Sequence, residues 1–321
     1  MRSLILGMLF CLLALTPAWA LSGATTDNGD RFPFVVEIKR DGKLMCSGTV
    51  LYPRIVVTAA HCVQKKVYWR GGLVYVDEYV SAEALTVSVT HHGEAREYAV
   101  SDVDVSPDWQ RVIRNSNAGD RFIHDVAVIV TEEPVAVGLP PGLFQLAREA
   151  TLAQKPRYHA DDRPQTPEAA DVSAGDGDRA LGPLDGRGVI VAFGADHCEP
   201  MRGCDNAGIR RYQAVAIMRS TECFRNRYTR PQHPSLLPTA GADFPPAVWC
   251  MESLVFPGDS GGALFVEKPD GTLYFMGVIS AQQGLPPALA ALQRRKRSVA
   301  SALYPNLGFI TKTARKLGYV P

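Results

Sequence analysis

The segment Gly258-Asp-Ser-Gly-Gly262 places one serine among small residues that let the backbone turn tightly and let a substrate carbonyl approach closely. Ser260 is therefore the candidate nucleophile. A serine hydroxyl is a weak nucleophile at neutral pH unless a base accepts its proton, so a histidine has to come from elsewhere in the chain. The segment Thr58-Ala-Ala-His-Cys62 supplies that histidine, His61.

The histidine in turn needs a buried carboxylate that fixes its tautomer and stabilises the imidazolium. Asp125 directly precedes the apolar run Val126-Ala-Val-Ile-Val130 and so lies at the mouth of a predicted strand. The three residues then follow one another in the order His, Asp, Ser, which differs from the order in subtilisin and in the α/β-hydrolases.

Short runs rich in Val, Ile, Tyr and Thr recur in both halves of the chain and predict strands, with few helices. These runs are 34–39, 55–58, 84–89 and 126–130 in the first half, and 189–193, 212–217, 262–266 and 274–279 in the second. The pattern predicts two β-rich halves.

Four segments together resemble the signature segments of the chymotrypsin/trypsin-like serine protease family: Cys46-Ser-Gly-Thr49, Thr58-Ala-Ala-His-Cys62, His124-Asp-Val-Ala127 and Gly258-Asp-Ser-Gly-Gly262. The resemblance covers roughly residues 21–318, apart from two irregular segments. It implies an all-β fold of two antiparallel six-stranded β-barrels with a short C-terminal helix. It also implies that His61, Asp125 and Ser260 form a catalytic triad in the cleft between the barrels.

The expected organisation is one leader followed by one trypsin-like peptidase domain. Its parts are a signal peptide 1–20, a peptidase domain 21–318 with a first barrel at about 30–135, an exposed insertion at about 151–186, a second barrel at about 187–312, and a helix at about 311–319.

The signal peptide is inferred from Arg2, an apolar run over 4–15 and the small-x-small site Ala18-Trp-Ala20. A retained signal anchor is the alternative. Cleavage after Ala20 would leave a secreted or periplasmic protein with no membrane attachment. The formal net charge of +1 falls to zero when Arg2 leaves, which argues against nucleic acid as a partner. The expected partners are protein or peptide substrates, and we expect a monomer that needs no cofactor.

The family resemblance assigns further roles near Ser260. The backbone N–H groups of Gly258 and Ser260 would form the oxyanion hole. Ser280 would steady Asp125 and offer its carbonyl to substrate. A new N-terminal amine at Leu21 would pair with Asp259 and order the oxyanion hole, so that export itself would produce the active form.

Six cysteines remain once Cys11 leaves with the signal, and in an exported chain they predict three disulfides. By the resemblance we pair Cys46 with Cys62 and Cys223 with Cys250. The remaining cysteines, Cys198 and Cys204, are expected to pair and close a short local loop, an assignment that rests on their proximity in the sequence.

The specificity pocket should be apolar. By the resemblance its floor falls at Leu254, where trypsin-like members carry an Asp that pairs with substrate Lys or Arg. Val255 beside it and Gly308 across it suggest an open apolar pocket, with Gln282 at the rim. Medium and large apolar side chains at the cleaved residue (P1) remain alternatives.

Two segments are predicted to be solvated loops. The insertion contains Asp176-Gly-Asp178, but its spacing fits no calcium loop, and no metal site is predicted. The irregular segment 283–303 contains Arg294-Arg-Lys-Arg297, for which a processing site or anion patch is the alternative.

The sequence therefore predicts a secreted serine endopeptidase that acts through an acyl-enzyme and prefers apolar residues at P1. The alternative is a secreted pseudo-protease or binding protein on the same scaffold. Hydrolysis of esters by the same triad is a third possibility.

Overall fold

The computed structural model describes residues 24–28, 30–69, 72–110, 124–139, 187–195, 197–199, 203–218, 248–267, 271–283 and 297–319. The predicted signal peptide, Leu21, the insertion 151–186 and the Arg294-Arg-Lys-Arg297 segment, apart from Arg297 itself, lie outside these residues. Among the described residues, no helix is both long enough and apolar enough to cross a membrane.

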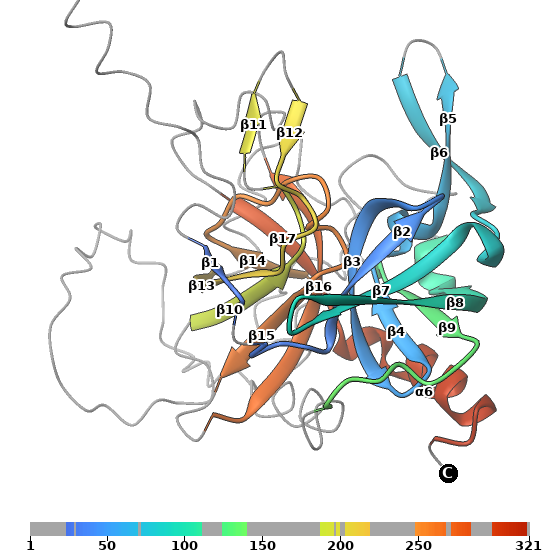
Figure 1. Cartoon of the computed structure of the whole chain (residues 1–321). Helices are drawn as coiled ribbons and strands as arrows, with labels where there is room; N and C mark the ends of the chain where they lie inside the picture. The colour runs from blue at the N-terminus through green and yellow to red at the C-terminus, as the bar shows by residue number, and fades with distance from the viewer. Residues whose placement is uncertain are drawn as a thin grey trace, which may run out of the picture.

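The first half of the chain forms a closed barrel of six antiparallel strands (Figure 1). In spatial order the strands are β2 (Val35–Arg40), β3 (Lys43–Tyr52), β4 (Ile55–Thr58), β9 (Ala127–Thr131), β8 (Glu94–Val105) and β7 (Leu85–His91). Val, Ile and Leu side chains from these strands are buried together and form the barrel's core. Burying each such side chain contributes roughly 1.5–3 kcal/mol.

The second half forms a seven-stranded sheet in which β13 also pairs with β14. This pairing closes six of the strands into a second barrel, and β1 (Thr25–Thr26) is added at its edge. The barrel strands are β13 (Arg211–Met218), β10 (Arg187–Ala192), β15 (Ala263–Glu267), β16 (Leu273–Gln283), β17 (Arg297–Ala302) and β14 (Val248–Met251). The predicted all-β, two-barrel fold is therefore confirmed.

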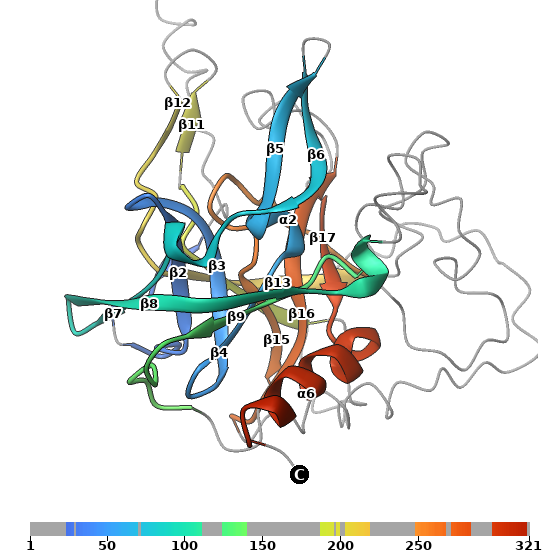
Figure 2. The ribbon, with the colours of Figure 1, turned by 90° about the vertical axis from the view of Figure 1, so that its right-hand side faces the viewer.

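Two hairpins project from the same end of the molecule in both views, one from each half (Figures 1 and 2). The first pairs β5 (Gln64–Trp69) with β6 (Gly72–Tyr79), and the second pairs β11 (His197–Glu199) with β12 (Gly203–Asp205). The short helix α2 (Ala60–Val63) leads into β5, and the 3₁₀ turn η1 (Ala82–Ala84) leads into β7.

The C-terminal helix α6 spans Leu307–Lys316 and follows the 3₁₀ turn η5 (Tyr304–Asn306), so it begins earlier than the 311 expected from composition. It ends where Gly318 takes the left-handed backbone conformation, φ +75°. There the Tyr319 N–H donates to the Ala314 carbonyl, a Schellman arrangement that stops a helix. Figure 2 shows α6 below the barrels, and its buried residues belong to the core of the first barrel.

The irregular segment 283–303 was predicted wrongly in its last part. Residues 297–302 form β17, which pairs with β16 on one side and β14 on the other. Its Ser-Val-Ala-Ser-Ala run is almost fully buried. Small residues fit between two neighbouring strands, but they carry little of the apolar signal by which a strand is recognised from sequence.

An aromatic cluster of Phe32, Phe34, Phe265 and Phe275 joins the two barrels. Phe32 and Phe34 lie just before β2 of the first barrel, whereas the other two come from β15 and β16 of the second. The Phe265 ring lies 6.0 Å from Phe32, 5.7 Å from Phe34 and 5.4 Å from Phe275, centroid to centroid. Such pairs add about 0.5–1.5 kcal/mol each beyond their burial, so the cluster stabilises the contact between the barrels.

Candidate active site

His61 and Asp125 meet in the first barrel, where α2 and the segment before β9 come together. The Asp125 carboxylate accepts two hydrogen bonds from the same residue: the His61 backbone N–H at 2.9 Å and the ring Nδ1 at 2.7 Å. The Asp125 side chain is 1% exposed and the imidazole 13% exposed. This two-point contact fixes the ring orientation and places a proton on Nδ1, which leaves Nε2 as the basic nitrogen.

The second barrel also holds Asp125. Ser280 Oγ donates to its carboxylate at 2.5 Å, and the Asp125 backbone N–H donates to Ser301 Oγ at 3.1 Å. Ser280 lies at an irregularity in the pairing of β16 with β17, between Ile279 and Ala281. Bulges of this kind re-aim a side chain beside functional sites, and here the bulge directs Ser280 toward the other barrel.

The backbone before Asp125 is strained. His124 has φ +56°, in the left-handed region that non-glycine residues rarely adopt. Its ring Nδ1 lies 3.2 Å from Asn306 Oδ1, which also accepts the Ser106 hydroxyl at 3.0 Å. These contacts hold the turn that presents Asp125 to His61. Asn306 was not among the predicted site residues, because only the fold brings η5 beside this turn.

The loop that carries Ser260 is pressed against the first barrel. The Ser47 backbone N–H donates to the Ser260 carbonyl at 2.7 Å, and the Ser47 hydroxyl donates to the Gly258 carbonyl at 2.8 Å. A Cβ atom at Gly261 would lie 2.1 Å from the Ser47 carbonyl oxygen and 2.2 Å from Thr58 Oγ1. The small residues in this motif therefore allow a close approach of the two barrels, and they leave Ser260 partly exposed.

Asp259, beside the candidate nucleophile, is fully buried. Its carboxylate accepts the backbone N–H groups of Phe256 at 2.8 Å and Gly194 at 2.9 Å. Burial raises the pKa of Asp259 to about 7, against the lowering effects of these two donors and of the Arg211 charge. Arg211 Nη1 in turn donates to the carbonyls of Gly194 and Asn206. A buried carboxyl with so high a pKa would gain from a further positive charge.

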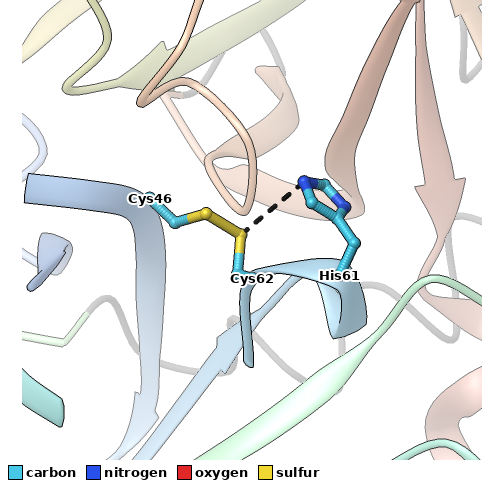
Figure 3. Close-up of side chains that lie close together, drawn as sticks. All are labelled: Cys46, His61 and Cys62. Atoms are coloured by element: carbon cyan, nitrogen blue, oxygen red, sulfur yellow. Dashed lines mark hydrogen bonds between the residues drawn. A yellow bond between two sulfur atoms is a disulfide. The ribbon is translucent and has the colours of Figure 1, made fainter. Parts of the chain in front are cut away.

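The predicted bridge between Cys46 and Cys62 is confirmed, with Cα atoms 6.1 Å apart. Figure 3 shows this disulfide beside the His61 ring, whose Nε2 lies 3.8 Å from Cys62 Sγ. The bridge pins the turn that carries His61. Because both sulfurs are bonded to each other, the group Cys46, His61 and Cys62 has no thiolate to offer a metal ion.

The other cysteines are described in part. Cys250 in β14 is disulfide-bonded, and its predicted partner Cys223 lies outside the described residues. Cys198 and Cys204 are direct register partners in the hairpin of β11 and β12, which places their backbones opposite each other. Their pairing stays a prediction.

The residues predicted for the specificity pocket lie on three different segments of the chain. Leu254 and Val255 are buried in the second half, 2% and 5% exposed, just before the Ser260 loop. Gln282 lies on β16 opposite Ser298 of β17. Gly308, by contrast, lies exposed in the first turn of α6, which packs on the first barrel. Gly308 therefore lies on a different element from the other three residues, and its place across the pocket stays a prediction.

Ser298 is a neighbour of the predicted pocket that sequence reasoning missed. It is fully buried, and its hydroxyl donates to the Ser253 carbonyl at 2.9 Å, next to Leu254. A serine in a run of small residues carries no signal of this position, which depends on the pairing of β16 with β17.

Comparison with known proteins supports these observations. A protein-family model described as Trypsin matches residues 21–159, a range that includes His61 and Asp125 but not Ser260. Two curated relatives, Trypsin delta and Trypsin gamma of Drosophila erecta, are each 30% identical to this chain over 91 residues. These residues are 26% of this chain and 34% of each relative, so the match spans about a third of the relatives' length.

Proposed function

We propose that this chain is a secreted serine endopeptidase of the chymotrypsin/trypsin-like family. The Trypsin match over residues 21–159 and the two-barrel fold support this proposal. The observation that carries the proposal is the fixed contact of His61 with Asp125, made by both the backbone N–H and the ring of His61. This contact prepares Nε2 to accept a proton from a hydroxyl nucleophile, and Ser260 is the nucleophile that we assign.

The first step is acylation of the enzyme. Ser260 Oγ attacks the carbonyl carbon of the scissile peptide bond, and its proton passes to His61 Nε2. The resulting imidazolium is stabilised by the Asp125 carboxylate, which keeps its negative charge. The imidazolium then gives its proton to the leaving amine as the C–N bond breaks, which leaves an ester between Ser260 and the acyl part of the substrate.

Hydrolysis of the ester repeats the same proton transfers. Water attacks the acyl carbon while His61 takes its proton, and Ser260 recovers a proton as the acid product leaves. In both steps the backbone N–H groups of Gly258 and Ser260 stabilise the negative oxygen of the tetrahedral intermediate. Each such donor contributes about 2.7–4 kcal/mol of transition-state stabilisation.

We propose protein or peptide substrates with an apolar residue at P1. Leu254 and Val255 are buried apolar residues just before the nucleophile loop, and they offer no carboxylate to a basic side chain. Ser298 adds a small hydroxyl whose proton is already given to the Ser253 carbonyl. A panel of peptides that differ at P1 tests this: cleavage after Leu or Phe is expected, and cleavage after Arg alone would refute it.

We propose that removal of a signal peptide, residues 1–20, yields a secreted or periplasmic peptidase domain over 21–318. The amine freed at Leu21 would pair with Asp259, whose pKa burial raises to about 7, because an adjacent positive charge favours the ionised carboxylate. The mature chain would act as a monomer. N-terminal sequencing of exported protein tests the cleavage, and a start well beyond Leu21 would contradict it.

The test of the catalytic assignment is labelling with a serine-directed fluorophosphonate probe, followed by peptide mass spectrometry. We expect an adduct at Ser260 in the wild type and none in Ser260→Ala. A second variant, Asp125→Asn, should fold and label far more slowly, because it holds His61 in the wrong tautomer and such a change lowers kcat about 10⁴-fold. Absence of labelling in folded wild-type protein beginning at Leu21 would favour the pseudo-protease or binding-protein alternative.

A further inference from the structure

Two histidines and one aspartate converge on the outside of the first barrel, away from the residues assigned to catalysis. His91 ends β7 and His92 begins the turn to β8, while Asp30 lies in the segment between β1 and β2. The Nδ1 atoms of both histidines lie 3.1 Å from the same oxygen, Asp30 Oδ2. The two imidazole rings are side by side, with centroids 4.0 Å apart.

This spacing suits a tetrahedral metal ion. Zinc binds imidazole nitrogen and carboxylate oxygen at about 2.0–2.2 Å, so that ligand atoms around a tetrahedral ion lie ~3.3 Å from one another. The observed separations of 3.1 Å from each Nδ1 to Asp30 Oδ2 are close to this value. The two rings are 51% and 78% exposed, so an ion could enter and keep water as a fourth ligand.

The carboxylate is held in place by a buried arginine. Arg210, whose side chain is 4% exposed, donates to Asp30 Oδ1, to Asp27 Oδ2 at 2.8 Å and to the Thr90 carbonyl at 3.0 Å. One guanidinium thus positions both Asp30 and the residue that precedes His91. Outer partners of this kind orient metal ligands and are part of metal sites in general.

The backbone conformation favours the same conclusion. Asp30 and His92 have φ +51° and +49°, two of the five non-glycine left-handed residues in the described part of the chain. Such strain concentrates at functional sites.

We propose that Asp30, His91 and His92 bind a divalent transition-metal ion, with zinc as the probe ion. Imidazole ligands favour zinc, copper or nickel over calcium, which takes six to eight oxygen ligands. The site ties the segment before β2 to the β7–β8 hairpin. Through Arg210, which directly precedes β13, it also reaches the second barrel. Metal binding therefore stabilises the junction of the two halves and takes no part in the chemistry of Ser260.

The test is a titration of the purified protein with Co²⁺, whose visible absorption reports four-coordinate binding, followed by displacement with Zn²⁺. We expect one equivalent per chain and a rise in Tm with Zn²⁺ that a chelator reverses. His91→Ala and His92→Gly should each lower the affinity tenfold or more, because even outer partners of metal ligands are worth 10–100-fold. Glycine suits the left-handed backbone at 92, so that variant tests the ring without adding strain.

Two matched variants locate the binding. His197→Ala, in hairpin β11–β12, and His61→Ala, in the candidate active site, should both keep the Co²⁺ spectrum and the Tm rise. A metal affinity equal to that of the wild type in His91→Ala and His92→Gly would overturn the proposal. Failure of the wild type to bind Zn²⁺ at millimolar concentration would overturn it as well. A pH-dependent change in stability in these two variants with no metal binding would reduce the cluster to ion pairs and would equally overturn it.

Discussion

Gly261 lies at the point where the nucleophile loop touches the first barrel. It combines two demands: φ +83°, which disfavours any side chain, and a Cβ position 2.1 Å from the Ser47 carbonyl oxygen. Gly271, in the turn between β15 and β16, shares the first demand, with φ +81°, but has open space around it. A comparison of alanine variants at the two positions therefore separates the cost of backbone strain from the cost of overpacking.

We expect Gly271→Ala to lower the free energy of unfolding by roughly 1–2 kcal/mol, the cost of a side chain in the left-handed region. Gly261→Ala should lower the free energy of unfolding by the same amount and by a further ~1–3 kcal/mol from overpacking. Its activity should also fall, because the loop that carries Ser260 shifts. Urea unfolding of both variants measures the difference. Equal losses in the two variants would show that the contact with Ser47 relaxes without cost.

The raised pKa of Asp259 should make the free energy of unfolding depend on pH. Its pKa is raised by burial from 3.8 to about 7 in the folded chain, so the folded state holds this proton more tightly than the unfolded state does. The stabilisation from this group is present below about pH 4 and is lost as the pH rises through 7. In Asp259→Asn this part of the slope should vanish.

A chain that begins at Leu21 should behave differently from one that carries an extension before it. If the free amine pairs with Asp259, the folded pKa falls and stability no longer declines toward pH 7. The difference in unfolding free energy between the two forms should then grow from pH 4 to pH 7, as measured by urea titration. A constant difference across that range would rule out the pairing.

Among the elements, the disulfide and the turn that it pins form one unit. The bridge between Cys46 and Cys62 closes a loop of sequence separation 16 and joins β3 to α2. Replacing both cysteines by alanine should lower the free energy of unfolding by about 3 kcal/mol, the value for a loop of this size. The measurement is urea unfolding, with kcat determined on the folded fraction.

A lower kcat in that folded fraction is also expected, because the bridge lies against the His61 ring. If stability falls while kcat stays the same, then the bridge constrains the unfolded chain and does not position His61. The Asp125 contacts alone would then fix the imidazole.

The elements also show what the sequence could reveal. The eight runs rich in Val, Ile, Tyr and Thr all form strands, as expected for residue types that are enriched in β-sheets. The strand β8 was missed, since its first four residues, Glu-Ala-Arg-Glu, are all exposed and buried residues begin only at Tyr98. The strand β17 was missed for lack of large apolar residues.

Candidate site residues divide in the same way. His61, Asp125 and Ser260 carry signals in their own flanking residues. Ser301 and Asn306 carry none, because their contacts depend on how segments 176 to 200 positions apart meet in the folded barrels. Gly308 lies in the first turn of α6, a helix that begins earlier than the sequence predicted.

At the scale of the whole molecule, the aromatic cluster determines whether the two barrels act as one. Phe265 is fully buried and its ring lies against Phe32, Phe34 and Phe275. Phe265→Ala should lower the free energy of unfolding by about 3–5 kcal/mol. Phe265→Leu, which keeps most of the apolar volume, should lose less than half as much.

In both variants, the loss of activity and the change in tryptophan fluorescence should occur at the same urea concentration, because Asp125 needs partners from each barrel. Loss of activity well before the fluorescence change would show that the barrels separate while each stays folded. It would also show that the cluster, and not the cores, governs function.

The division of the site between the two barrels bears on when proteolysis can start during synthesis. His61 and Asp125 leave the ribosome with the first barrel, whereas Ser260 follows after more than 130 further residues. The Ser280 contact and the strand that carries Ser301 come later still. A partly made or truncated chain therefore holds a base without a nucleophile. On the proposed assignment of Ser260, such an incomplete chain cannot form an acyl-enzyme, so proteolysis would begin only after the second barrel has been made.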